Sequence, residues 1–227
     1  GPISDPVILA EAKKVLSEEL DIHPSYELKS IEPLEDTEGV RIEFVDSDGK
    51  ERSETYQKVL IAAGRKPNMD KLGLENAGIE PVERGRYDID PRTLQLGGEP
   101  FFVAGDVNDL HPLLHEASDD GRIAGQNAAR FPEVRAPLRR TSLGIAFTDP
   151  QIAVVGAGYD KLESCSAVVG EVDYGDQGRA RVHAMNAGRV RLYADKKTGR
   201  LLGGEFFGPR AEHLAHLIAW AVQQSMT

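Results

Sequence analysis

The last third of the chain carries six strand-like runs in succession, and this pattern constrains the fold more strongly than any other feature. The runs are LGIAF, QIAVVG, GEVDYG, ARVHAM, RVRLYAD and RLLGGEFFG. Residues 197–199 have the composition of a hairpin turn, which would make the last two runs antiparallel neighbours. A helix is expected from near Pro209, with apolar residues on one face at Leu214, Leu217, Ile218 and Val222. The polar, proline-bearing connector PEVRAPLRR at 132–140 is a candidate domain boundary, and the chain after it is expected to form an α+β domain with an antiparallel sheet.

The first 65 residues predict one helix, one hairpin and one buried strand. The helix falls in SDPVILAEAKKVLSEEL, where Ser4 or Asp5 can cap it and Pro6 suits its first turn. The hairpin turns at Asp48-Gly49, after apolar residues that alternate along the strand. The run VLIAA at 59–63 predicts a fully buried strand. Because one helix and so few strands cannot cover both faces of a parallel sheet, residues 1–65 are expected to be the end of a larger α/β domain.

Charge and cysteine content exclude several functions. The 227 residues carry a formal net charge of −10, which disfavours non-specific binding of nucleic acid. No apolar run approaches the roughly 18 residues of a membrane span, so no membrane partner is expected. The single cysteine, Cys165, excludes an internal disulfide, is expected to be inert, and suits a cytoplasmic location. His213 and His216 have a spacing that could bind metal, but without a third ligand they are interpreted as a helix face, and no metal site is expected.

The run FFVAGDV ends a strand-like segment in Gly105 and Asp106. A carboxylate at this point can accept a strong, directional hydrogen bond from a ribose or ribitol hydroxyl. The equally weighted alternative is that Asp106 caps the following region or pairs with a nearby arginine. A helix is predicted in PLLHEASDDGRIAGQNAARF, with His115 in its first turn, and its start offers free backbone N–H groups to an electronegative ligand atom.

Two further glycine-containing segments allow two interpretations each. In VLIAAGRKPN, Gly64 would let another group approach the backbone, although a plain exit from strand to loop is favoured on this segment alone. The segment QIAVVGAGYDK has the form of a dinucleotide-binding fingerprint, but Lys161 stands where Gly or Ala is expected. A strand that ends in a glycine turn is favoured there.

Taken in order, these segments resemble the flavin-dependent pyridine nucleotide–disulfide oxidoreductases. The matching stretches, which cover nearly the whole chain, are DPVILAEAKKVL, VLIAAGRKPN, LGLENAGI, FFVAGDV, LLHEASDDGRIAGQNAA, FTDPQIAVVG and GRVRLYADKKTGRLLGGEFFGPRAEHLAHLIAWAV. The resemblance implies FAD and NAD as cofactors. It implies the end of a Rossmann-like NAD domain at 1–65, a central FAD-binding segment at 66–137, and an interface domain at 138–227 that builds a homodimer. It assigns Asp106 to the ribitol of FAD. The other implied contacts are the helix start beside the flavin ring, at Pro112, Leu113, Leu114 and His115, and the NAD site, at Gly64 and Leu28.

The same resemblance implies a fragment. The family's N-terminal FAD half with its CxxxxC disulfide, the fingerprint that opens its NAD domain, and its C-terminal HPxxxE stretch have no counterpart in the sequence. The fragment alone is therefore expected to be inactive and to hold no catalytic residue. The parent reaction would pass electrons from a dithiol such as dihydrolipoamide, through a protein disulfide and FAD, to NAD⁺. Components of a 2-oxoacid dehydrogenase complex would be its partners. The alternatives are another reductase of the family, acting on glutathione, mercury, coenzyme A disulfide or a second nicotinamide, and a non-catalytic dimerisation module.

Overall fold

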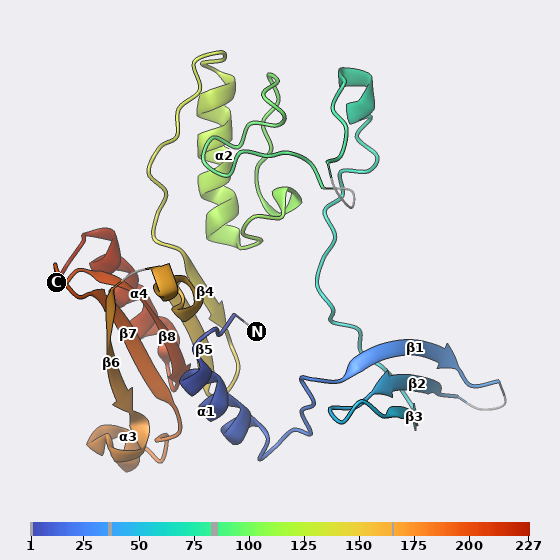
Figure 1. The fold of residues 1–227 in the computed structure, drawn as a ribbon, viewed down its shortest axis with the longest axis vertical. Coiled ribbons are helices and arrows are strands. Elements are labelled where there is room, and N and C mark those ends of the chain that lie inside the picture. Colours follow the sequence, from blue (N-terminus) through green and yellow to red (C-terminus); the bar gives the residue numbers. More distant parts are fainter. Residues whose placement is uncertain (1, 36–37, 83–85, 165) are drawn as a thin grey trace. The chain divides into compact units, whose positions relative to one another are not determined.

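The chain forms two compact units. The computed structural model describes residues 2–35, 38–82, 86–164 and 166–227. The first unit joins the segments Gly1–Ala62 and Thr141–Thr227, and the second unit is Ala63–Arg140. Figure 1 shows two sheets in the first unit and the long helix α2 in the second. No helix in the described part of the chain is long and apolar enough to cross a membrane.

The C-terminal segment builds a five-stranded sheet in the first unit. Its strands are β4 (Leu143–Ala146), β5 (Gln151–Gly156), β6 (Ala167–Asp173), β7 (Arg189–Asp195) and β8 (Leu201–Gly208). Their order is β4-β5-β8-β7-β6, and every neighbouring pair is antiparallel, which confirms the expected α+β architecture. The strand predicted at ARVHAM is wrong, because a short helix, α3 (Gly178–Val182), forms there. The side chain of Gln177 accepts the backbone N–H of Ala180 at 2.6 Å, and this cap starts the helix.

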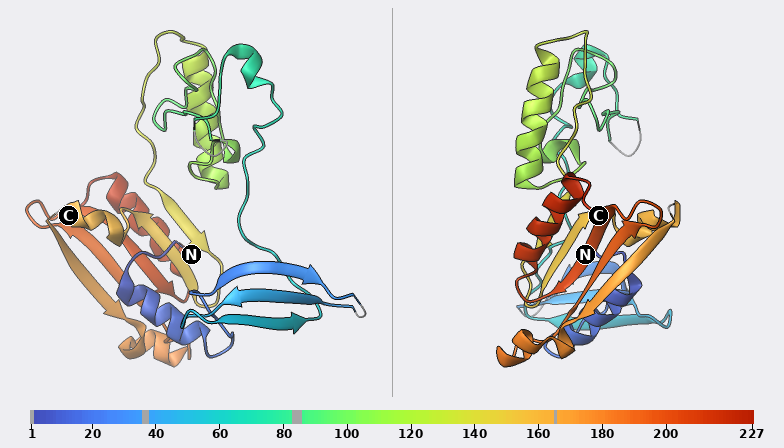
Figure 2. Two further views of the ribbon diagram at one scale, coloured as in Figure 1. Left: turned by 45° about the vertical axis from the view of Figure 1, so that its right-hand side comes forward. Right: turned by 90° about the vertical axis from the view of Figure 1, so that its left-hand side faces the viewer.

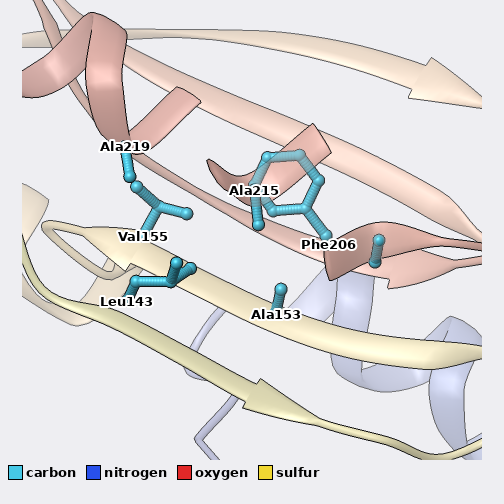
Figure 3. Packing of buried hydrophobic residues seen from close by; sticks show 7 residues of the cluster. Leu143, Ala153, Val155, Phe206, Ala215 and Ala219 are labelled. Carbon is cyan, nitrogen blue, oxygen red and sulfur yellow. The ribbon is translucent and has the colours of Figure 1, made fainter. Parts of the chain in front are cut away.

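Two helices cover opposite faces of this sheet. Phe206 and Phe207 are neighbours on β8, so their side chains point to opposite faces. Phe206 packs with α4 (Ala211–Gln223), in a cluster of Leu143, Ala153, Val155, Phe206, Ala211, Ala215 and Ala219 (Figure 3). Phe207 packs with Ile8 and Ala12 of α1 (Pro6–Leu16). The two views of Figure 2 show the same arrangement, with the sheet between the two helices.

A buried aspartate fixes the start of α1 on the sheet. Asp5 accepts the backbone N–H of Val7 at 2.9 Å and so caps the helix. The same carboxylate accepts hydrogen bonds from Arg191 at 2.7 Å and from the Tyr193 hydroxyl at 2.8 Å, both on β7. Burial alone would raise the pKa of Asp5, but the bonds from Arg191, Tyr193 and Val7 outweigh it and hold that pKa below its ordinary value.

A second buried carboxylate satisfies the backbone beside this cap. Glu205 on β8 is fully buried, and it accepts backbone N–H groups of Ser4 at 3.0 Å, Asp5 at 2.9 Å and Tyr159 at 3.0 Å. Buried backbone donors need such acceptors, since an unpaired one destabilises the fold. The two carboxylates therefore tie the chain before α1 to the middle of the sheet.

The N-terminal segment also forms a smaller antiparallel sheet, of β1 (Glu27–Pro33), β2 (Val40–Val45) and β3 (Glu51–Tyr56). The hairpin turn predicted at Asp48-Gly49 is confirmed, and Asp46 holds it by accepting the N–H groups of Asp48 at 2.9 Å and Lys50 at 3.0 Å. The buried strand predicted at VLIAA is wrong. Residues 57–66 contain no strand, and Leu60 is 92% exposed. A buried parallel strand needs hydrogen-bonded neighbours on both sides, and no strand of the described residues lies beside this run.

The second unit consists of α2 (Leu114–Ala128) and loops with two short 3-10 turns, η1 (Leu74–Ala77) and η2 (Asp106–Asn108). One core cluster joins Ile123 and Ala124 of α2 to Leu94. A second is made by Met69, Ile79 and Leu96. The strand predicted at FFVAG is wrong: Phe102 makes an isolated bridge with Gln95, and Val103 donates to the carbonyl of Leu94 at 3.0 Å. These backbone contacts pack the run against a loop instead of a sheet.

Candidate cofactor-binding site

Asp106 lies at the start of η2 with its carboxylate half-exposed to solvent. Arg65 pairs with it through Nη1 and donates from Nη2 to the carbonyl of Pro112 at 2.7 Å. The guanidinium therefore joins the two ends of the loop between Asp106 and α2. Of the roles weighed for Asp106 from the sequence, pairing with an arginine is the one seen in the structure. Because the pair is largely exposed, it contributes little stability and leaves carboxylate surface open to a ligand.

Gly105 gives the turn before Asp106 its shape. Its φ of 80° and ψ of −164° fall in a region that only glycine adopts readily. A Cβ at this position would lie 3.4 Å from the Cβ of Ala117 on α2, so the turn packs closely on the helix. Glycine is thus needed for the backbone conformation of this turn, and an added Cβ would make only an ordinary contact with α2.

The start of α2 carries the four other residues expected beside a flavin. Leu113 is the N-cap residue, and its side chain makes no capping hydrogen bond, so the first-turn N–H groups keep their donor capacity. Leu114 is 89% exposed and His115 is also exposed. Pro112 precedes them and is tied to Arg65. The structure therefore brings Asp106 and Pro112 to one place, with Leu113, Leu114 and His115 directly after it in the chain.

Sequence reasoning missed the buried support of this loop. Asp120, on α2, accepts hydrogen bonds from the backbone N–H of Gly105 at 3.2 Å and from the side chain of Asn108 at 2.6 Å. Arg139 donates to Asp120 at 2.5 Å and to Glu116 at 2.9 Å. The partners of Asp120 lie 12 to 19 positions away, so no local pattern in the sequence could have shown them.

A cleft of about 360 Å³ adjoins Arg65 within the second unit. It is lined by Arg65, Lys66, Pro67, Met69, Arg86, Tyr87, Ile89, Val107, Asn108, Asp109 and Leu110. Arg86 pairs with Asp109 at 3.6 Å, and Lys66 pairs with Asp70 at 2.5 Å. The cationic groups beside the cleft are thus largely compensated.

Gly64 and Leu28, the two residues expected at an NAD site, fall in different units. Gly64 has a φ of 100°, is exposed and directly precedes Arg65. Leu28 is 58% exposed on β1 of the first unit, opposite Phe44 of β2. It lines a hollow of about 410 Å³ beside Tyr26, whose ring stacks on that of Phe44 with centroids 4.8 Å apart. An aromatic, partly apolar surface of this kind suits a flat heterocycle.

The segments interpreted as structural lie in regular secondary structure. The QIAVVG run is β5, and it ends at Gly156, whose φ is 60° and where a Cβ would lie 2.5 Å from the carbonyl oxygen of Leu202. His216 contacts the backbone carbonyl of Glu212 at 2.7 Å on α4. No group of three or more metal-ligating side chains was found among the residues that the structure describes. Cys165 lies outside the described residues.

The chain belongs to the pyridine nucleotide–disulphide oxidoreductase family. The family model described as "Pyridine nucleotide-disulphide oxidoreductase" matches residues 3–121, and the model of the family's dimerisation domain matches residues 143–227. Among curated relatives, the dihydrolipoyl dehydrogenase of Halobacterium salinarum is 32% identical over 96% of this chain and 46% of its own length. That of Bacillus subtilis is 30% identical over 92% of this chain and 43% of its own length. The chain thus spans about half the length of these relatives.

Solved structures agree with this assignment. The structure of LpdA from Mycobacterium tuberculosis has a TM-score of 0.82 at 27% identity, and the match covers 100% of this chain and 48% of that one. The flavoprotein disulfide reductase RclA from Escherichia coli has a TM-score of 0.80 at 22% identity, with 99% of this chain and 51% of that one covered. The second likeness shows the fold alone.

Proposed function

We propose that these residues form part of an oxidoreductase that passes electrons from a dithiol, through a protein disulfide and FAD, to NAD⁺. The observation that carries the proposal is the placement of Asp106. Its half-exposed carboxylate stands on a glycine turn, and Arg65 ties it to the carbonyl of Pro112, two residues before α2 begins at Leu114 without a side-chain cap. A carboxylate accepts hydrogen bonds from hydroxyl groups, and a helix start donates N–H groups and favours negative charge. Together they suit a polyol chain that is joined to a ring able to take up negative charge.

The residues present fit FAD, and each has a definite role in the proposal. Asp106 accepts a ribitol hydroxyl and so orients the chain that carries the ring. Pro112, Leu113, Leu114 and His115 place the backbone of the α2 start beside the ring. FAD itself supplies the conversion of two dithiol electrons into a hydride that NAD⁺ can accept. Gly64 and Leu28 are the proposed NAD contacts in this chain.

Dihydrolipoamide is the proposed dithiol, because the two curated relatives at 32% and 30% identity carry the name dihydrolipoyl dehydrogenase. The corresponding partners are components of a 2-oxoacid dehydrogenase complex, and the proposed location is the cytoplasm. A homodimer through the segment after Arg140 follows from the match of residues 143–227 to a dimerisation domain. The exposed apolar face of α4, with Leu217 55% and Trp220 67% exposed, is the proposed contact surface.

The 227 residues alone are expected to show no dithiol:NAD⁺ activity. A protein disulfide needs two thiols, and this sequence holds one cysteine. The measurement is NADH formation from dihydrolipoamide and NAD⁺, compared between this chain and the full product of its gene. The full product is expected to be active and to show flavin absorbance. Activity of the 227 residues that is abolished by Cys165→Ala would contradict the expectation. A full gene product that is inactive and free of flavin would favour the alternative function, a non-catalytic dimerisation module.

Replacing Asp106 by alanine in the full gene product is expected to weaken FAD binding by about 10- to 100-fold. The lost charge-assisted hydrogen bond is worth about 1.5–3 kcal/mol. Affinity is measured by titrating the flavin-depleted protein with FAD and following flavin fluorescence. Asp109→Ala is the matched control, because Asp109 is also an exposed carboxylate at η2 and pairs with Arg86 instead. Equal FAD affinity of Asp106→Ala and Asp109→Ala would show that Asp106 has a structural role only.

A further inference from the structure

Asp120 connects α2 to both sides of Asp106. Its side chain is 1% exposed. One oxygen, Oδ2, accepts the N–H of Gly105 at 3.2 Å and an amide N–H of Asn108 at 2.6 Å. These donors belong to the residue directly before Asp106 and to the residue two positions after it. One carboxylate on a long helix therefore fixes the backbone from which the Asp106 side chain projects.

Arg139 supplies the charge that lets this carboxylate remain buried. It donates to Asp120 Oδ1 at 2.5 Å and to Glu116 at 2.9 Å. Burial alone would lower the pKa of Arg139, but the bonds to Asp120 and Glu116 outweigh it and raise that pKa. A buried carboxylate is stable only when paired and hydrogen-bonded, and removing one member of such a set is strongly destabilising locally. The contact between Asp120 and the loop is therefore persistent.

The other contact of Asp106 is of a different kind. Arg65 holds the Asp106 side chain from the solvent side, and its own side chain is 64% exposed. Exposed pairs contribute little and exchange readily with water or ligand groups. A hydroxyl can thus replace Arg65 at the carboxylate, whereas the backbone of Asp106 stays where Asp120 holds it.

We propose that Asp120 is the positioning residue of this site: through Gly105 and Asn108 it holds the Asp106 carboxylate where the ribitol hydroxyl of FAD is accepted. This inference rests on the proposed function, because it requires that Asp106 binds FAD. Asp120 touches no ligand and acts through the geometry of the loop. Pre-organisation of this kind raises affinity because the loop need not be ordered on binding.

The test is a double-mutant cycle on FAD affinity in the full gene product. Asp120→Asn places an amide N–H₂ among the three donors of Gly105, Asn108 and Arg139, so one acceptor position is lost. FAD binding is expected to weaken about tenfold. In an Asp106→Ala background the same change is expected to have no further effect, since residues that act through one contact are not additive. Asp119→Asn is the matched control, because Asp119 is 6% exposed on the same helix and pairs with Arg140 at 3.4 Å.

A second measurement needs no flavin. Hydrogen exchange at the Gly105 amide is expected to be faster in Asp120→Asn than in Asp119→Asn, and unchanged exchange would overturn the positioning role. Equal weakening of FAD binding by Asp120→Asn in both backgrounds would also overturn it, because Asp120 would then act on the fold at large. Full FAD affinity in Asp106→Ala would instead overturn the proposed function. If Asp120→Asn fails to fold, Asn108→Ala replaces it, since this change breaks the loop contact and leaves the Asp120–Arg139 pair intact.

Discussion

Replacing Asp5 by alanine is expected to lower the free energy of unfolding by about 3–5 kcal/mol, because it breaks a buried ion pair from one side. Arg191 would lose its partner at 2.7 Å, the Tyr193 hydroxyl would lose its acceptor at 2.8 Å, and α1 would lose its N-cap. Urea titration followed by circular dichroism measures the change. The control is Lys14→Ala on the same helix, whose side chain is 72% exposed and whose contact with Glu11 is a long pair at 4.0 Å that should be worth under about 1 kcal/mol. Similar midpoints for the two variants would contradict the expectation.

The contribution of Asp5 to the free energy of unfolding should also depend on pH, and it should decrease as the pH is lowered. Its pKa in the folded protein lies below the ordinary value of 3.8. A depressed pKa means that the ionised form stabilises the fold, so the contribution is fully present above about pH 5. It is lost progressively as the pH falls below 3.8 and through the folded-state pKa. The difference in stability between wild type and Asp5→Ala should therefore shrink as urea titrations are repeated at lower pH.

Replacing Gly203 by alanine is expected to destabilise the five-stranded sheet by about 3 kcal/mol or more, at the upper end of overpacking effects. An added Cβ on β8 would lie 2.3 Å from the carbonyl oxygens of both Val155 and Ala157, and these backbone atoms cannot rotate away. Strand β8 would have to separate from β5, its neighbour in the middle of the sheet.

The control for this substitution is Gly170→Ala on the edge strand β6, where an added Cβ would meet nothing within 4 Å. Alanine costs less conformational entropy than glycine on folding, so Gly170→Ala should be neutral or stabilise by about 0.5–1 kcal/mol. Thermal unfolding followed by circular dichroism compares the two variants. The steric argument fails if both melt within a degree or two of wild type.

Secondary structure was predicted best from the sequence where it depends on residues that are close together in the chain. The β5, β7 and β8 runs and the Asp48-Gly49 hairpin are set by alternation and turn residues, which are visible locally. VLIAA and FFVAG have the apolar content of strands, but a strand also needs a partner, and a single run carries no information about one. The ARVHAM run begins in a helix because the side chain of Gln177 caps α3 just before the run. The apolar alternation of the run alone indicated a strand.

The same distinction applies to the candidate site. The GD turn pointed to Asp106 from the sequence, because glycine followed by an acid at the end of an apolar run is a local signal. Its actual partner, Arg65, is 41 positions away, and the support from Asp120 and Arg139 spans 19 positions. Such partners are chosen by tertiary packing. The sequence therefore indicated which side chain could bind a hydroxyl, and not what holds that side chain in place.

The closure of the sheet by α1 has a consequence for synthesis on the ribosome. Ile8 and Ala12 complete their core with Ile152 and Phe207, and the backbone of Asp5 is bonded to Glu205, 200 positions later. At roughly 5–20 residues per second, translation takes about 10–40 s to reach β8 after the helix has been made. During this interval the apolar stripe of α1 has no sheet to cover. The first unit can therefore complete its core only after β8 has been made.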